Sequence, residues 1–300
     1  MKEKNYKSLD EFYKKKFGFK VCKVSLDAGF DCPNKDGSKG FGGCIFCNGS
    51  IGIGDKDLSL KEQFMQVKDT LYKKWPNAKF IPFLEANTNT YADVKELRKI
   101  YEELLDFDEV VGLCISTRCD AFTGEIYDLL EEINQKTYLS IELGLQSSFD
   151  ETLKFLNRGH TVDEFTSCVR ELRRRKIDVV VHVINGLPYE TEEMMIETIK
   201  YVNSLNVQGI KFHMLFIEEG TALAELYDRE HFTLLSQEEY VRILGKQLEM
   251  LDKAVVVHRL LSGPDNKKLI EPKWLVGKFK NLNYIEMFLR DHNIKQGQKK

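Results

Sequence analysis

The sequence predicts an α/β fold, a partial (β/α)6 TIM-like barrel with a C-terminal extension. Six short apolar runs rich in β-branched residues recur within residues 20–216, and segments with helical spacing separate them. Each run ends in a polar or glycine-bearing turn, as strands do when their C-terminal ends meet at one functional face. The same alternation also fits a doubly wound sheet, because periodicity does not distinguish the two arrangements.

The expected strands and helices alternate along the chain. We expect strands at 20–27, 79–84, 109–116, 138–145, 178–184 and 209–216, and helices at 60–75, 92–106, 124–133, 163–176 and 191–205. Thr191, followed by Glu193 and Met194, marks the start of the last helix, because a threonine side chain can cap free backbone N–H groups. These units form an expected core domain at 1–223, and residues 224–300 form an extension that covers the barrel opening.

The extension combines a helix at 236–251, an apolar run at 255–261 and a basic stretch at 263–281. Trp274 and Phe279 alternate there with lysines, a combination that can bind a phosphate backbone and stack on bases. By pattern alone, a solvated charged surface is the simpler explanation. The lysines are Lys267, Lys268, Lys273, Lys278 and Lys280.

The composition is that of a globular protein, with 300 residues of which 42% are hydrophobic and 30% charged. No apolar run approaches the roughly 20 residues that a membrane-spanning helix needs, and the N-terminal segment is charged. We therefore expect a cytoplasmic protein without a membrane partner, in which cysteines stay reduced.

Three of the seven cysteines, Cys32, Cys44 and Cys47, lie in a glycine-rich loop after the first expected strand. Clustered reduced thiols indicate a metal or redox site. Zinc would need a fourth ligand such as His160 or Cys119. A redox C-x-x-C pair would leave Cys32 unused, whereas an iron–sulfur cluster on three thiolates would leave one iron open to a ligand.

The stretch KVSLDAGFDCPNKDGSKGFGGCIFC (23–47) resembles the cluster-binding loop of the radical S-adenosylmethionine (SAM) superfamily. The usual spacing there is C-x3-C-x2-C, and the C-x11-C-x2-C of this chain resembles the Elongator-like, YhcC/YtqA-type branch. The resemblance implies that Cys32, Cys44 and Cys47 hold a [4Fe-4S] cluster whose fourth iron binds SAM. It also implies that one electron from the cluster cleaves SAM to a 5′-deoxyadenosyl radical, which abstracts hydrogen from the substrate.

Two further motifs imply contacts to the polar parts of SAM. EANTNTY (85–91) stands where the family places a glycine-rich turn near the methionyl amino group, which makes Asn87 and Thr88 candidates. LGLQS resembles a fourth-strand motif and makes Gln146 a candidate ribose contact. In LNRGH, Arg158 has the offset of the arginine that binds the SAM carboxylate, a role that suits a guanidinium fork.

The last two strands carry the remaining candidates. HVINGLP has His182 where the family usually has an acidic ribose ligand, and KFHML places Met214 and Leu215 beside the adenine. Glu142 is a candidate for contact with SAM or substrate. A purely structural role is the alternative for each of these side chains, because a histidine inside an apolar run is more often a core residue.

The resemblance to Elongator-type enzymes, which act on the wobble uridine of tRNA, implies a tRNA substrate and a flavodoxin- or ferredoxin-like reductant protein. The step that fits is conversion of 5-carboxymethylaminomethyl uridine to 5-aminomethyl uridine, because a radical between nitrogen and carboxylate is stabilised. Arg118 and Lys211 are candidates for holding that carboxylate. We expect no acetyl transfer, because residues 224–300 are too few for an acetyltransferase domain.

Two other functions stay open at this point. One is a radical SAM enzyme that acts on a small metabolite or a peptide. The other, from a different class, is a zinc-stabilised nucleic-acid-binding protein without catalysis. The residue that handles the substrate is not identified by the sequence.

Overall fold

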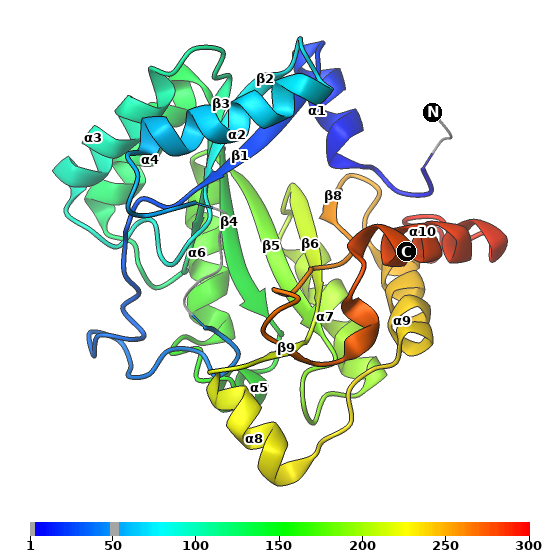
Figure 1. Ribbon diagram of the computed structural model, residues 1–300. Coiled ribbons are helices and arrows are strands. Elements are labelled where there is room, and N and C mark those ends of the chain that lie inside the picture. The colour runs from blue at the N-terminus through cyan, green and yellow to red at the C-terminus, as the bar shows by residue number, and fades with distance from the viewer. Residues whose placement is uncertain (1–3, 49–53) are drawn as a thin grey trace.

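The computed structural model describes residues 4–48 and 54–300. Within this part of the chain, a seven-stranded parallel sheet curls into an open half-barrel with helices on its outer face (Figure 1). The strand order is β1-β2-β3-β4-β5-β6-β8, so neighbours in the sheet follow one another along the chain apart from the short β7. The predicted partial TIM-like α/β barrel is confirmed.

The elements alternate as predicted. The strands of the half-barrel are β1 Val21–Leu26, β2 Lys79–Leu84, β3 Gly112–Thr117, β4 Tyr138–Gln146, β5 Asp178–Asn185, β6 Gly209–Met214 and β8 Val256–Arg259. The helices are α1 Leu9–Phe17, α2 Leu60–Lys74, α3 Val94–Leu105, α4 Gly124–Lys136, α5 Asp150–Phe155, α6 Val162–Arg174, α7 Glu192–Ser204, α8 Ala222–Glu230, α9 Gln237–Met250 and α10 Lys278–Asp291. A two-stranded ribbon of β7 Ile217–Glu218 and β9 Leu269–Glu271 and a short 3-10 helix, η1 Lys273–Leu275, lie outside the sheet.

Hydroxyl side chains begin most of the helices. Thr191 caps α7, as predicted, because its side chain accepts a hydrogen bond from the backbone N–H of Met194. Ser59 and Glu62 form a reciprocal capping box at the start of α2. These caps satisfy N–H groups that the first helical turn leaves unpaired, and they fix where each strand-to-helix turn ends.

The sheet has one strand more than the six that the sequence predicts. The apolar run at 255–261, expected in the extension, contributes β8, which pairs in parallel with β6 and places Val256 opposite Gly209. The long connection between them carries β7, α8 and α9, and α9 packs against α7. The boundary between a core at 1–223 and an extension at 224–300 stays a prediction, although β8 is hydrogen-bonded into the sheet.

One end of the half-barrel lumen is closed by α1. Tyr13 of α1 is buried against Ile81 and Phe83 of β2 and Cys114 of β3. The backbone of Lys7 also accepts a hydrogen bond from Val257 of β8, so the N-terminal segment contacts both edges of the sheet. The strands finish at the opposite end of the half-barrel (Figure 1).

None of the described helices is both long enough and apolar enough to span a bilayer.

Candidate active site

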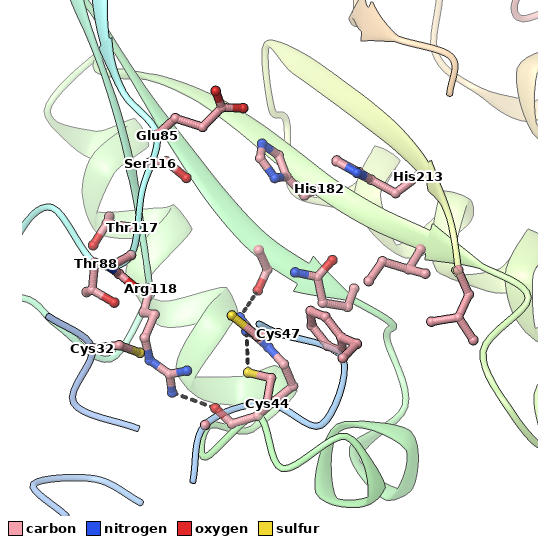
Figure 2. Close-up of a pocket in the computed structure, with 18 of the residues that line it drawn as sticks. Cys32, Cys44, Cys47, Glu85, Thr88, Ser116, Thr117, Arg118, His182 and His213 are labelled. Atoms are coloured by element: carbon pink, nitrogen blue, oxygen red, sulfur yellow. Dashed lines mark hydrogen bonds between the residues drawn. The ribbon is translucent and has the colours of Figure 1, made fainter. Parts of the chain in front are cut away.

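A cavity of about 210 Å³ lies at the C-terminal ends of the strands (Figure 2). All ten residues predicted to bind the cluster or SAM line it, although they come from loops and strands far apart in the sequence. They are Cys32, Cys44, Cys47, Asn87, Thr88, Gln146, Arg158, His182, Met214 and Leu215. This convergence on one cavity makes it the candidate active site.

The turn between α5 and α6 holds the cysteine loop in place. Asn157, in the left-handed region at φ 52°, donates from Nδ2 to the carbonyl oxygens of Phe41 (2.9 Å) and Gly43 (2.7 Å). The backbone N–H of Ile45 donates to the carbonyl of Leu156 at 3.1 Å. These hydrogen bonds position the loop together with the packing of Phe30, Ile45 and Phe46 against the hydrophobic clusters.

Arg158 follows Asn157 and points into the cavity. Its Nη1 donates to Sγ of Cys44 at 3.1 Å, and its Nη2 donates to the carbonyl oxygen of Gly144 at 2.6 Å. Guanidinium N–H groups of this kind orient and stabilise a metal-bound sulfur. The Nε atom of Arg158 is buried without a hydrogen-bond partner, so one donor is left for a ligand.

The two candidates in the turn after β2 differ in their surroundings. Asn87 donates from Nδ2 to the carbonyl of Phe30 (3.0 Å) and accepts from Nζ of Lys35 (3.1 Å), so its amide supports the cysteine loop. The hydroxyl of Thr88 is buried without a partner. Thr88 is therefore better placed than Asn87 to contact a ligand with its side chain.

Five of the described side chains that line the cavity have buried polar atoms without a hydrogen-bond partner. They are Oγ1 of Thr88, Nη1 of Arg118, Oε1 of Gln146, Nε of Arg158 and Nε2 of His213. Gln146 is held at φ 73° where the register of β4 against β5 shifts, and this turns its amide toward the cavity. Buried polar atoms normally find partners, so this group fits a polar ligand with both donors and acceptors.

The three thiols do not form a closed metal site. Within residues 4–48 and 54–300, no three His, Cys, Asp or Glu side chains lie close enough together to hold a metal ion. Figure 2 shows Cys44 beside Cys47, with Cys32 farther away toward Arg118. Binding of a cluster would therefore require the thiols, which already line one cavity, to move together.

A buried carboxylate lies in the lumen between the cavity and α1. Glu142 of β4 accepts hydrogen bonds from Lys23 (2.5 Å), Lys211 and His182 (2.7 Å), and it is fully buried. Burial opposes its ionisation, but the charges of Lys211 and Lys23 hold the pKa of Glu142 well below its usual range. Glu142 does not line the cavity, so it positions His182 and the lysines.

The histidines of the lumen are neutral at pH 7. Burial, with the nearby charge of Lys211, lowers the pKa of His182 to about 4, although Glu142 opposes this shift. Burial also lowers the pKa of His213 well below its usual value, and the charges of Arg259 and Lys211 add to the effect. Both side chains line the cavity on the side away from the cysteines (Figure 2).

Several cavity residues were missed at the sequence level. Glu85 and Arg259 lie at the ends of β2 and β8, and Glu218 lies in β7. Glu85 is the first residue of the motif EANTNTY, two positions before the candidate Asn87, so its position at a strand end was a usable signal. Glu218 begins the turn EEGT (218–221) after the last expected strand, so its position was also a usable signal. Arg259 could not be placed, because its strand assignment depends on long-range pairing.

Neither predicted holder of a substrate carboxylate is free of a partner. Arg118 lines the cavity, but its Nε and Nη2 make a two-point contact with Asp120 at 2.9 and 2.8 Å. Lys211 is buried against Glu142. Both cations are therefore already paired with a carboxylate of the protein.

A half-barrel with a three-cysteine loop after β1 and an anchored arginine beside it defines an enzyme class that uses a thiolate-held cluster and a small polar cosubstrate. The chain belongs to the radical SAM superfamily. The profile of that superfamily matches residues 38–202, and the profile of the Radical_SAM C-terminal domain matches residues 207–291.

Individual proteins agree with this assignment. The protein YtqA of Bacillus subtilis (strain 168) is 40% identical over 300 residues, which cover 99% of this chain and 93% of the relative. This confirms the predicted relation to the YhcC/YtqA-type branch. The tRNA uridine(34) acetyltransferase of Methanocaldococcus jannaschii is 30% identical over 156 residues, which cover 50% of this chain and 28% of that enzyme.

A solved structure shares the fold. Elp3 of Methanocaldococcus infernus, with an N-terminal deletion, superimposes with a TM-score of 0.67 at 17% identity. The match covers 92% of this chain and 64% of that one, so this chain spans less than two thirds of its length.

The enzymes of this superfamily use a [4Fe-4S] cluster and SAM, and the cavity fits both groups. Three thiols supply the donor type that iron–sulfur clusters require, and the unpartnered polar atoms suit the carboxylate, amine and hydroxyls of SAM. Met214 and Leu215, both buried, supply an apolar wall.

Replacing Glu142 with glutamine should lower the free energy of unfolding by about 3–5 kcal/mol, because the buried ammonium groups of Lys23 and Lys211 lose their counter-charge. Urea unfolding at pH 7.5, followed by circular dichroism, measures the change. Glu197→Gln is the matched control, since its partner is Lys200 and both side chains are about half exposed. That variant should lose less than about 0.5 kcal/mol, and similar losses in both would contradict the role of Glu142.

Stability should fall on mild acidification because His182 stays neutral in the folded state. Its pKa of about 4 lies below the usual 6.5, so between these values only the unfolded chain takes up the proton. The unfolded state binds more protons there, and stability therefore rises with pH. His182 alone should cost about 1.4 kcal/mol between pH 7.5 and 5.5. The difference in urea-unfolding free energy between these pH values should shrink by that amount in His182→Asn, and an unchanged difference would refute the assignment.

Proposed function

We propose that this radical SAM enzyme modifies the wobble uridine of tRNA by converting a 5-carboxymethylaminomethyl group to 5-aminomethyl. The observation that carries the proposal is the charge of the cavity. Among the described side chains that line it, four are cations and two are carboxylates: Lys35, Arg118, Arg158 and Arg259 against Glu85 and Glu218. Such a lining favours ligands with carboxylates, and both SAM and this nucleoside carry one.

In this proposal the cysteine side of the cavity holds the cofactors. Cys32, Cys44 and Cys47 bind the cluster, and Arg158 binds the SAM carboxylate through its unpartnered Nε. This division is supported by the contact between Arg158 and Cys44, which would place a carboxylate next to the cluster.

The remaining predicted residues divide into ligand contacts and supports. Thr88 and Gln146 offer unpartnered polar atoms to SAM, and Met214 and Leu215 form the wall for the adenine. Two others support their neighbours. Asn87 is hydrogen-bonded to the backbone of the cysteine loop, and His182 is hydrogen-bonded to Glu142.

The atoms and electrons of the proposed reaction balance. When bound, the cluster and SAM supply a 5′-deoxyadenosyl radical, which takes one hydrogen atom from the CH2 between the substrate's nitrogen and carboxylate. The substrate radical then loses a proton, and one electron passes to a carrier of the flavodoxin or ferredoxin type. The resulting imine takes up water and separates into the 5-aminomethyl nucleoside and glyoxylate.

A basic surface beside the cavity supports tRNA as the substrate. Lys267, Lys268, Lys278 and Lys280 are exposed, and the ring of Phe279 is 80% exposed on α10. Phosphate contacts and a stacking ring are the usual means of binding a flexible anticodon loop. Trp274 does not add a second stacking surface, because its indole N–H donates to Leu235 and its ring packs near Tyr240.

The similarity to a tRNA uridine(34) acetyltransferase further supports a wobble-uridine substrate. The family assignment argues against the alternative of a zinc-stabilised binding protein without catalysis. A small metabolite or a peptide remains the competing substrate class.

Cys44→Ala should abolish both cluster binding and reductant-dependent cleavage of SAM, because two thiolates cannot hold the cluster. Iron and sulfide content after anaerobic reconstitution, together with 5′-deoxyadenosine formation, measures both properties. Cys22→Ala is the control, since Cys22 is a buried thiol of β1 that does not line the cavity. Full iron and sulfide content in Cys44→Ala would remove Cys44 from the ligand set.

Reconstituted wild-type enzyme with SAM and reductant should convert the carboxymethylaminomethyl nucleoside in tRNA to the aminomethyl form and release one glyoxylate per conversion. Mass spectrometry of digested tRNA measures the nucleosides. Binding of tRNA should weaken steeply as salt increases, because lysines contact phosphates. SAM cleavage without any change in this nucleoside would refute the substrate assignment and favour a metabolite or a peptide.

A further inference from the structure

Most cations of the cavity already have a partner. Arg118 contacts Asp120 through two nitrogens, and Lys35 donates to Asn87. Arg158 faces Cys44, on the side proposed for SAM. A second carboxylate, on the substrate, would therefore need another cation.

Arg259 is that cation. It is the last residue of β8, at the open edge of the sheet, and about a third of its side chain is exposed to the cavity mouth (32%). Its nearest carboxylate is Glu85 at the end of β2, and their closest nitrogen–oxygen distance is 3.8 Å. This separation exceeds hydrogen-bond distance, so the guanidinium fork is available for a two-point contact with another carboxylate.

The surroundings of Arg259 leave its positive charge largely uncompensated. His182 and His213 lie close to it and are neutral, as their lowered pKa values indicate. Lys278, at the start of α10, adds a second positive charge. Although the residue is exposed, desolvation by neighbouring protein atoms lowers its pKa, and the charge of Arg259 contributes to this shift. Glu142 is buried against two lysines, so Glu85 is the carboxylate that opposes Arg259 and Lys278 in this part of the described structure.

The position of Arg259 also suits a substrate rather than a cofactor. Glu85, His182 and His213 lie across the cavity from Cys44 and Cys47 (Figure 2). Arg259 lies opposite Glu85 on this far side, and Lys278 of α10 is near enough for its charge to interact with that of Arg259. A nucleoside entering from α10 would meet Arg259 before it reached the cysteine loop.

We infer that Arg259 binds the carboxylate of the substrate's side chain and thereby distinguishes substrate from product. This inference rests on the proposed function. The substrate side chain carries a carboxylate, whereas the aminomethyl product carries only a protonated amine, which Arg259 and Lys278 would repel. The same residue would thus favour both substrate binding and product release.

The test compares the affinities of two anticodon stem-loops that differ only in the carboxymethyl group. Wild-type protein should bind the acid-bearing RNA about 10- to 100-fold more tightly than the aminomethyl RNA, which is the range expected for a two-point charged contact. Arg259→Ala should abolish this preference, and Arg259→Lys, which keeps the charge but loses the fork, should retain part of it. Glu85→Gln should increase the preference, because it removes the competing carboxylate.

Arg174→Ala is the matched control, since Arg174 is an exposed arginine at the end of α6 whose partner is Glu171. It should keep the wild-type preference, and thermal unfolding of every variant identifies misfolded protein.

If wild-type protein converts the nucleoside but Arg259→Ala keeps the preference, the inference fails and the proposed function stands. If Arg259→Ala weakens both RNAs equally, Arg259 contacts a phosphate and the inference also fails. If wild-type protein converts no nucleoside and shows no preference, the proposed function itself fails.

Discussion

The hydrogen bonds from Asn157 to the cysteine loop are the constraint on which the rest of the site depends. The described part of the loop that follows β1, residues 27–48, has glycines at several of its turns and buries few apolar side chains, chiefly Phe30. Asn157 fixes its backbone at Gly43, and Gly159 lets the turn approach closely, because a Cβ there would come within 2.6 Å of Asn34. The intervening Arg158 is then aimed at Cys44. One short turn therefore places both a cysteine and the arginine proposed for the SAM carboxylate.

A second constraint is that the lumen of the open half-barrel must be filled by side chains, because a half-barrel does not close on itself. Apolar side chains fill the end near α1, and polar side chains lie closer to the C-terminal ends of the strands. Tyr13 and Phe83 occupy the end near α1, and the ammonium groups of Lys23 and Lys211 lie over the ring of Phe83 at 4.9 and 4.5 Å. Glu142 neutralises part of their charge. What remains above this layer is a cavity with neutral histidines and a surplus of positive charge.

The strand-end motifs could be predicted because they are local. The spacing of the cysteines and the order of Gln146 and Arg158 are fixed by short segments, and the structure brings all of them to one cavity. Arg259 was missed because β8 joins the sheet only through pairing with β6 across a long connection. The sequence also could not show that Trp274 packs inward while Phe279 stays exposed, since both lie in the same basic stretch. The sequence also could not predict the ion pairs, because Lys211 and its partner Glu142 are 69 positions apart.

The distribution of thiols fits radical chemistry as well as cluster binding. An S–H group is a ready hydrogen-atom donor, so a free thiol facing the substrate would quench a carbon radical. The cysteines that line the cavity in the described structure are those of the loop, where a cluster would occupy them. Cys114 lies deeper, between Lys23 (3.1 Å) and Glu142 (3.3 Å), and burial raises its pKa to about 12, so it stays a thiol. Glu142, Lys23 and Lys211 thus have a second effect besides balancing charge. They separate the Cys114 thiol from the space in which a substrate radical would form.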